Sequence, residues 1–252
     1  MSRRIDLTAV SADGATAPLS VELAAVLNMG SATRDAAVAK LHQDEVALHG
    51  VKIATHVPAP RLYPMAVDGV STGNRVEVHT AETSGEVEIV LVFADRLYVG
   101  VGSDHTDRLL ERASIPYSKQ ACANVIAPTV WPFAELAETW DQCVLRSWVD
   151  GRLYQEVGVD AFLRPEAIRD ILSERAPGFP QKDSLAFCGT IVSVDKRLGF
   201  GSRWEFELED PAGGRRIRHA YDVVDMFDMI RPEYRVPVLT GTVGPDDLPH
   251  RS

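Results

Sequence analysis

The segment Gly85–Phe93, GEVEIVLVF, most constrains how this 252-residue chain can fold. Successive side chains of a strand point to opposite faces, so Glu86 and Glu88 share one face with Val90 and Val92. The other face is wholly apolar. A strand that is apolar on both faces is typical of the buried centre of a sheet. Two carboxylates on such a strand repel each other and lose hydration, at a penalty of several kcal/mol per ion.

The next segment brings a third carboxylate to the same place. A tight turn after the first strand sends residues 97–104 back alongside it, which places Asp104 opposite Glu86 and Gly102 opposite Glu88. Directly opposed residues share a face, so three carboxylates converge beside a glycine. The alternative, a solvated Glu-x-Glu face, is disfavoured by the apolar flanks. The pattern predicts a bound cation, and oxygen-only ligands suit Mg²⁺, Mn²⁺ or Ca²⁺.

Charge and cysteine content exclude several partner classes. The formal net charge is −10, which repels nucleic acid and anionic membranes. No segment has the unbroken apolar length of a transmembrane helix, and the N-terminal residues lack the apolar stretch of a secretory signal. Three widely spaced cysteines without a CxxC motif indicate reduced thiols. We therefore expect a soluble cytoplasmic protein with no nucleic-acid or membrane partner.

Strand-like and helix-like segments alternate along the chain, which indicates an α+β fold that is mainly β. Residues 1–30 are predicted to form one or two strands and a short helix. Further helices are expected over residues 33–49 (N-cap Thr33), 107–119, 130–140 and 165–175. Hairpin turns are expected at Asp150-Gly151 and Gly213-Gly214. The proline-rich segment 56–67 is predicted to be an extended loop or lid. We divide the chain into residues 1–55, an N-terminal cap segment with a helix, and residues 56–252, the catalytic domain.

The order of motifs resembles that of the fumarylacetoacetate hydrolase superfamily. Its members carry E-x-E on a strand and then N-D-x-S-x-R-D, which correspond here to Glu86-Val87-Glu88 and to SDHTDR at residues 103–108. A lysine, an NG…Q hairpin and a GTI loop follow in the family. They are matched here by Lys119, residues 150–155 and residues 189–191. The string GVGSDHTDR resembles that of a bacterial branch of the superfamily.

The resemblance implies a mixed β-roll with an N-terminal helical cap, a homodimer, and a divalent ion on Glu86, Glu88 and Asp104. Mg or Mn is the expected metal, with Ca as the alternative. The implied catalytic and substrate-binding residues are Lys119, Arg108, Thr190 and Gly189. Tyr63, beside Pro64 in the proline-rich segment, is a further candidate for substrate binding. Hydrolases of the superfamily activate water with a His-Glu pair. The nearby candidates are His42, His49 and His56, and we select His56, in the proline-rich loop, as the general base.

Three functions follow from this interpretation. The favoured one is a metal-dependent hydrolase that cleaves a carbon–carbon bond in a small 2-oxo or dioxo acid, with the ion polarising the substrate carbonyl. The second is a lyase (decarboxylase or hydratase) or a tautomerase acting on a 2-oxo acid, which needs no water-activating pair. The third is a ligand-binding protein of the same fold without turnover.

Overall fold

The structure is a computed structural model, and it describes residues 3–236 and 238. The α-helices are α1 (Ala36–Ala47), α2 (Arg108–Glu111), α3 (Ile115–Gln120) and α4 (Pro165–Arg175). The strands are β1 (Arg3–Val10), β2 (Thr16–Leu23), β3 (Ala25–Gly30), β4 (Arg61–Met65), β5 (Val70–Ser71), β6 (Arg75–Val78), β7 (Thr83–Ser84), β8 (Val87–Phe93), β9 (Leu97–Asp104), β10 (Thr106–Asp107), β11 (Asn124–Ile126), β12 (Thr129–Pro132), β13 (Val144–Val149), β14 (Arg152–Gly158), β15 (Ser184–Phe187), β16 (Arg203–Asp210) and β17 (Arg215–Asp225).

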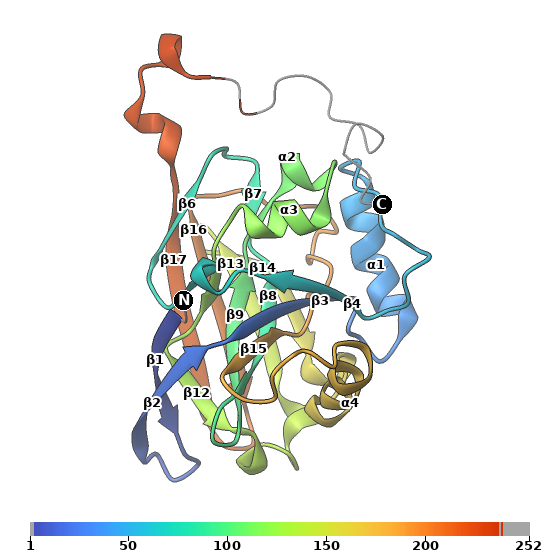
Figure 1. Ribbon diagram of the computed structural model, residues 1–252, viewed down its shortest axis with the longest axis vertical. Helices are drawn as coiled ribbons and strands as arrows, with labels where there is room; N and C mark the ends of the chain where they lie inside the picture. The colour runs from blue at the N-terminus through green and yellow to red at the C-terminus, as the bar shows by residue number, and fades with distance from the viewer. Residues whose placement is uncertain (1–2, 237, 239–252) are drawn as a thin grey trace.

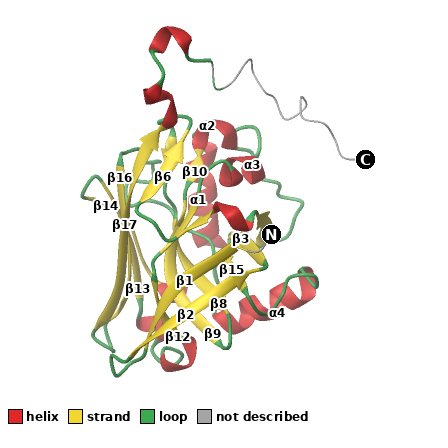
Figure 2. Ribbon diagram, turned by 60° about the vertical axis from the view of Figure 1, so that its left-hand side comes forward, coloured by secondary structure: helices red, strands yellow, loops and turns green. Residues whose placement is uncertain are grey.

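Two sheets form the body of the molecule, and they lie against each other in Figure 2. The larger sheet has ten strands in the order β2-β1-β12-β9-β8-β15-β3-β4, with β11 and β5 attached beside β9. The smaller sheet has five strands in the order β14-β13-β16-β17-β6. One apolar cluster includes residues of both sheets, among them Leu91, Val101, Trp204 and Phe206. The predicted mainly β, α+β fold is confirmed.

The opposite face of β8 packs into a second apolar cluster. Val90 and Val92 belong to this cluster together with residues of β1, β12 and β15, such as Leu7, Val130 and Phe187. All seven residues of β8 are buried. The prediction of a central strand buried on both faces is therefore confirmed, and Glu86 and Glu88 continue the Val90 face of this strand.

The predicted register of β8 and β9 is also confirmed. Glu88 pairs with Gly102, and the backbone N–H of Asp104 donates to the carbonyl of Glu86 at 3.0 Å. Gly102 is required by space: a Cβ there would lie 2.4 Å from the carbonyl oxygen of Val125 and 2.8 Å from the Phe187 ring. The missing side chain lets β11 approach β9 beside the carboxylates.

The substitution Gly102→Ala should lower the free energy of unfolding by about 3 kcal/mol, because the added methyl group meets backbone that cannot move away cheaply. Chemical denaturation of the variant beside Gly178→Ala measures this. A Cβ at Gly178 meets nothing within 4 Å, so the control should stay within about 0.5 kcal/mol of the original protein. Equal stability of the two variants would contradict the packing described here.

The helix predictions have mixed outcomes. The helix over residues 165–175 is confirmed as α4, and residues 107–119 form two short helices, α2 and α3. The helix over residues 33–49 is confirmed as α1, but its N-cap is Asp35, whose carboxylate accepts from the Ala37 N–H at 2.7 Å. Both hairpin turns are present, and Asp150 and Gly151 have positive φ, as a tight turn requires.

The helix predicted over residues 130–140 is wrong. Thr129–Pro132 form β12, which pairs with β1 and β9, and only 3-10 turns follow at Phe133–Glu135 and Trp140–Gln142. Pairing in the large sheet outweighs the helix-like apolar spacing, and Trp131 is buried there. The short helix predicted in residues 1–30 is also wrong, because β1, β2 and β3 occupy this segment.

The proline-rich segment is partly strand. β4 pairs with β3 at the edge of the large sheet, a position that tolerates Pro64 because it needs no second hydrogen-bonding partner. The division at residue 55 stays a prediction. β1 and β3 of the first segment pair with strands of the 56–252 segment. α1 lies beside the edge of the large sheet, and α2 and α3 lie near the same edge (Figure 1).

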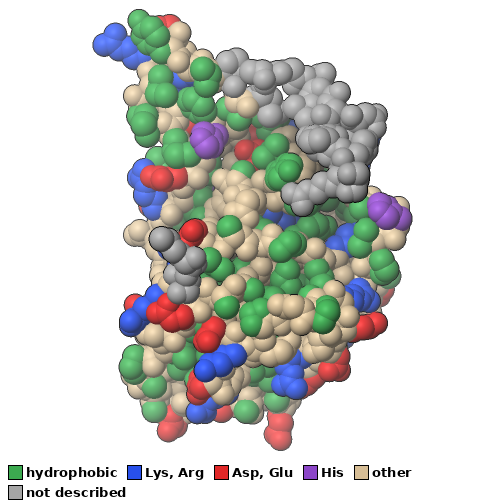
Figure 3. All heavy atoms as spheres, in the orientation of Figure 1, with side chains coloured by type: hydrophobic (Ala, Val, Ile, Leu, Met, Phe, Trp, Pro, Cys, Tyr) green, Lys and Arg blue, Asp and Glu red, His purple; other side chains and the backbone are tan. Residues whose placement is uncertain are grey.

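The helices and the surface charges concern the predicted lack of membrane and nucleic-acid partners. None of the helices among the described residues has the length and apolar character to cross a membrane. Acidic and basic side chains are interspersed on the face drawn in Figure 3. The exclusion of nucleic acid stays a prediction.

Candidate metal and substrate site

Three carboxylates meet where β8 begins and β9 ends. Glu86, Glu88 and Asp104 each offer an oxygen, and these atoms lie within 4.8 Å of one another. At most 3% of any of the three residues is exposed. The predicted convergence is therefore confirmed, and it follows from the period-2 alternation of β8 and the short turn between the two strands.

A buried lysine lies among these carboxylates. The ammonium group of Lys119, on α3, donates to Oε2 of Glu86 at 3.0 Å and to Oδ2 of Asp104. Burial opposes charging of this amine, but the charges of Asp104 and Glu86 outweigh burial and raise the pKa of Lys119 well above its usual value. Lys119 therefore neutralises part of the repulsion that the sequence assigned to a metal alone.

Arg108 holds Glu86 from the other side. Its guanidinium donates to Glu86 Oε1 at 2.8 Å, to Glu111 Oε2 at 2.8 Å and to Ser84 Oγ at 2.6 Å. Burial works against ionisation of Glu86, but Lys119 and Arg108 outweigh it and hold the pKa of this carboxyl well below its usual range. Arg108 is 1% exposed and does not line the cavity. Its predicted substrate contact is therefore revised: it orients Glu86.

Glu88 and Asp104 are compensated less completely than Glu86, although Lys119 also contacts Asp104. Burial and, next, the charge of Asp104 raise the pKa of Glu88 well above its usual value, although the Gly189 N–H donates to Glu88 Oε2 at 2.8 Å. Burial also raises the pKa of Asp104. Oδ1 of Asp104 is buried and has no hydrogen-bond partner among the described residues.

These observations fit a divalent cation. Three converging carboxylates form the oxygen-only donor set that Mg²⁺, Mn²⁺ and Ca²⁺ prefer. Oδ1 of Asp104 accepts no hydrogen bond of ordinary geometry, although the nearby Asn28 amide lowers the pKa of this carboxyl, so Oδ1 is available as a ligand atom. A cation would also favour the ionised form of Glu88. The site could therefore hold a divalent metal on Glu86, Glu88 and Asp104.

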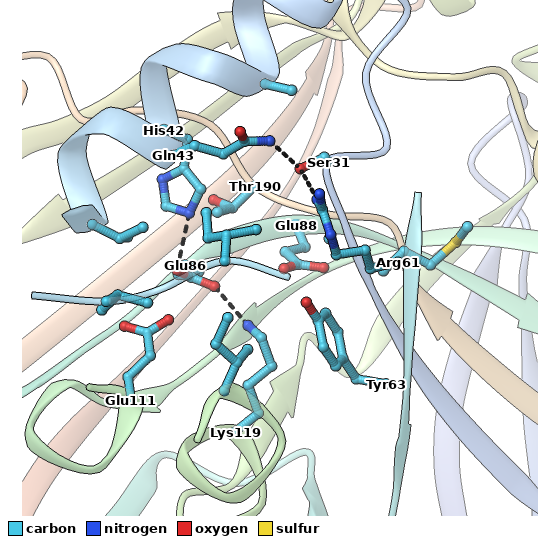
Figure 4. Close-up of a pocket in the computed structure, with 17 residues that line it drawn as sticks. Ser31, His42, Gln43, Arg61, Tyr63, Glu86, Glu88, Glu111, Lys119 and Thr190 are labelled. Atoms are coloured by element: carbon cyan, nitrogen blue, oxygen red, sulfur yellow. Dashed lines mark hydrogen bonds and ion pairs between the residues drawn. The ribbon is translucent and has the colours of Figure 1, made fainter. Parts of the chain in front are cut away.

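A cavity opens beside the carboxylates, under α1 (Figure 4). Its volume is about 50 Å³, enough for roughly four water molecules. Polar side chains on its wall include Arg61, Tyr63, Lys119 and Thr190. Apolar side chains from α1 and the following loop, such as Val46, complete the wall.

The GTI loop is fixed through Gln155. Its side-chain amide donates to Thr190 Oγ1 at 2.9 Å and to the Ile191 carbonyl at 2.7 Å, while its oxygen accepts from the Val87 N–H at 3.1 Å. Thr190 Oγ1 in turn donates to the Val87 carbonyl at 3.0 Å. This explains why the hairpin glutamine and the GTI loop occur together: they tie one wall of the cavity to β8.

A histidine–glutamate pair on α1 was missed in the sequence. His42 lines the cavity, with Nε2 3.4 Å from Glu86 Oε1 and Nδ1 3.1 Å from Glu45 Oε2. Glu45 is buried, and its Oε1 accepts from the N–H of Ser193 at 3.1 Å. Burial lowers the pKa of His42, but Glu45 and Glu86 outweigh it and raise the pKa to about 9. The signal was the H-x-x-E spacing of His42 and Glu45, which places both side chains on one side of a helix.

Some of the other predicted site residues line the cavity and some do not. Lys119, Thr190 and Tyr63 line the cavity, as a substrate-contacting role requires. The Gly189 N–H is used by Glu88, and Gly189 does not line the cavity. His56 is exposed and also absent from the lining, so we replace it with His42 as the candidate proton-transfer residue, which carries its proton near neutral pH because its pKa is raised.

The fold of the chain is shared with several solved structures. Three similar solved structures are a protein from Oleispira antarctica named as a fumarylacetoacetate isomerase/hydrolase, a 5-carboxymethyl-2-hydroxymuconate delta-isomerase from Mycobacterium smegmatis, and a 2-keto-3-deoxyarabinonate dehydratase. The first is 14% identical, with TM-score 0.57 over 85% of this chain and 98% of that chain. The second is 14% identical, with TM-score 0.53 over 84% and 85%. The third is 16% identical, with TM-score 0.52 over 80% and 74%.

These likenesses confirm, at the level of the fold, the resemblance to the fumarylacetoacetate hydrolase superfamily. The family described as "Protein of unknown function (DUF2848)" matches residues 29–221, so the chain belongs to the DUF2848 family. None of the curated proteins matches the sequence.

Proposed function

We propose that the protein is a divalent-metal-dependent hydrolase that cleaves a carbon–carbon bond in a small 2-oxo or dioxo acid. The observation that carries this proposal is the buried group of Glu86, Glu88 and Asp104 beside a cavity lined by His42, whose ring is held by Glu45. A divalent ion on these carboxylates supplies Lewis acidity towards the carbonyl and carboxylate oxygens of a 2-oxo acid. Proteins with this fold that are named as an isomerase, a dehydratase and an isomerase/hydrolase support an enzyme acting on small acids.

The residues of the cavity wall divide into binding and proton-transfer roles. Lys119 places a positive charge beside the carboxylates, where it attracts an anionic substrate and developing negative charge. Nε2 of His42 faces the same space, and Glu45 fixes the ring through Nδ1. A carboxylate that orients a histidine in this way sets which nitrogen exchanges a proton. His42 is therefore the residue that moves a proton to or from water or the leaving group.

The His42–Glu45 pair favours hydrolysis over the lyase alternative. A decarboxylase or tautomerase on the same carboxylates needs no residue to activate water, whereas this pair is built into a helix that covers the cavity.

The test compares the variants His42→Ala and His56→Ala. His56 is the general base predicted from the sequence. The Mn²⁺-loaded protein is first screened with a panel of 2-oxo and dioxo acids, and products are separated into acids and CO₂. His42→Ala should lower kcat by about 100-fold or more, and His56→Ala should leave it unchanged. Full turnover in His42→Ala with release of CO₂ would instead identify a lyase. Metal and ligand binding without any product would identify a binding protein.

A further inference from the structure

Arg61 contributes a cation to the cavity at a position that no motif predicted. It lies on the edge strand β4, opposite Gly30 of β3, and is 8% exposed. Its neighbour on the same face of β4 is Tyr63, two residues on, and both side chains line the cavity. Figure 4 shows the guanidinium on the far side of Glu88 from His42.

The charge of Arg61 is not balanced by a carboxylate. Its Nε donates to the carbonyl of Ala54 at 3.0 Å and its Nη1 to Ser31 Oγ at 3.3 Å, and both acceptors are neutral. Among the described residues, no carboxylate oxygen lies within 4.0 Å of its guanidinium. The two other buried cations of the site, Arg108 and Lys119, each contact two carboxylates. A buried guanidinium without a counter-charge is costly, and an anionic group of the ligand would remove that cost.

Strand register relates the backbone position of Arg61 to that of the carboxylates. Asn28 of β3 pairs with Tyr63 and exchanges side-chain hydrogen bonds with Asn124, and Asn124 pairs with Asp104. The Asn28 level therefore lies beside the metal-binding end. Arg61 lies two residues from Tyr63 along β4, a step of about 7 Å. A ligand that contacts both places needs its two polar ends a few carbons apart.

We propose that Arg61 binds a second, distal carboxylate of the substrate, so that the site selects dicarboxylic 2-oxo acids over monocarboxylic ones. This inference rests on the proposed function, because the first carboxylate and the ketone are those held at Glu86, Glu88 and Asp104. A planar guanidinium forms paired hydrogen bonds with a carboxylate. A substrate that ends in a methyl group instead of this carboxylate cannot form them. Arg61 is thus a specificity-determining residue.

The experiment uses two acids of equal length, 2-oxoglutarate and 2-oxopentanoate, which differ only in a terminal carboxylate or methyl group. Dissociation constants of both are measured by calorimetry with the Mn²⁺-loaded protein. The original protein should bind 2-oxoglutarate at least tenfold more tightly. In Arg61→Met this ratio should fall to about one. Arg96→Met, at the exposed turn between β8 and β9, is the matched control and should keep the original ratio.

Arg61→Lys guards against a folding defect in Arg61→Met, because it keeps the charge but loses the paired geometry. Its ratio should fall between those of the original protein and Arg61→Met. The inference is overturned if the original protein shows no preference, or if the ratio is unchanged in whichever Arg61 variants fold. Failure of the proposed function has another signature: binding of 2-oxopentanoate that does not depend on Mn²⁺. Absence of binding by both acids counts against both proposals.

Discussion

The substitution Glu88→Gln is expected to weaken Mg²⁺ or Mn²⁺ binding by about 100-fold or more. Changes to residues that merely support metal ligands already cost about 10- to 100-fold in affinity, and here a ligand itself is changed. The amide keeps the shape of the side chain and can still accept the hydrogen bond from Gly189, so the loss reports on charge. The same change in Asp104→Asn should have a similar effect, because it removes the carboxylate whose Oδ1 has no other partner.

The metal-free form of Glu88→Gln should be more stable than the original protein at pH 8. Burial and Asp104 raise the pKa of Glu88 above its usual value of 4.5 in the folded state. A raised pKa means that the folded protein holds this proton more tightly than the unfolded chain does. The stability it contributes is present below pH 4.5 and is lost as the pH rises towards the folded pKa. Glutamine has no proton to lose, so the advantage of the variant grows with pH.

Both effects are measured on the same samples. Calorimetric titration gives the metal affinity, and denaturation at several pH values in the presence of a chelator gives the stability. Glu77→Gln, on the exposed side of β6, is the control and should change neither quantity appreciably. Metal affinity that survives in Glu88→Gln and Asp104→Asn would show that the three carboxylates do not form the metal site.

The register of β8 and β9 could be predicted because few physical choices exist there. The tight turn pairs Phe93 with Leu97, and the two-residue period then carries this register back along both strands to Glu88 and Glu86. The same reasoning located Asp104 and the room left by Gly102. Lys119 and Thr190 were found differently, through the order of motifs shared with the resembling superfamily. Nothing in their local sequence indicates which element they contact.

The packing of α1 could not be read from its sequence. The proline-rich loop favoured His56 over His42 and His49, but His42 is the one that reaches Glu86, because α1 covers the site. The spacing of His42 and Glu45 was visible, but its meaning depends on Ser193, which is distant in sequence and holds Glu45. Arg61 was not predicted as a site residue because its proline-rich segment was interpreted as a loop, whereas residues 61–65 form the edge strand β4.

The substitution Arg108→Met is expected to lower the free energy of unfolding by about 3–5 kcal/mol. This is the usual loss when one partner of a buried ion pair is removed and its counterpart stays charged. Arg108 contacts Glu86, Glu111 and Ser84, all buried, so the variant leaves two carboxylates without their main hydrogen-bond donor. The midpoint of thermal unfolding should fall by roughly 2–4 °C for each kcal/mol lost.

Arg112→Met is the matched control, since Arg112 lies four residues away and pairs with Glu82 on the surface. An exposed ion pair of this kind contributes about 0–1 kcal/mol, so the control should unfold close to the original protein. Arg108→Lys should fall between the two, because an ammonium group cannot reproduce the three hydrogen bonds of the guanidinium. If Arg108→Met loses no more stability than Arg112→Met, the carboxylates must be stabilised by something other than Arg108. In that case Lys119, or an ion bound to the same carboxylates, would have to supply most of the compensating charge.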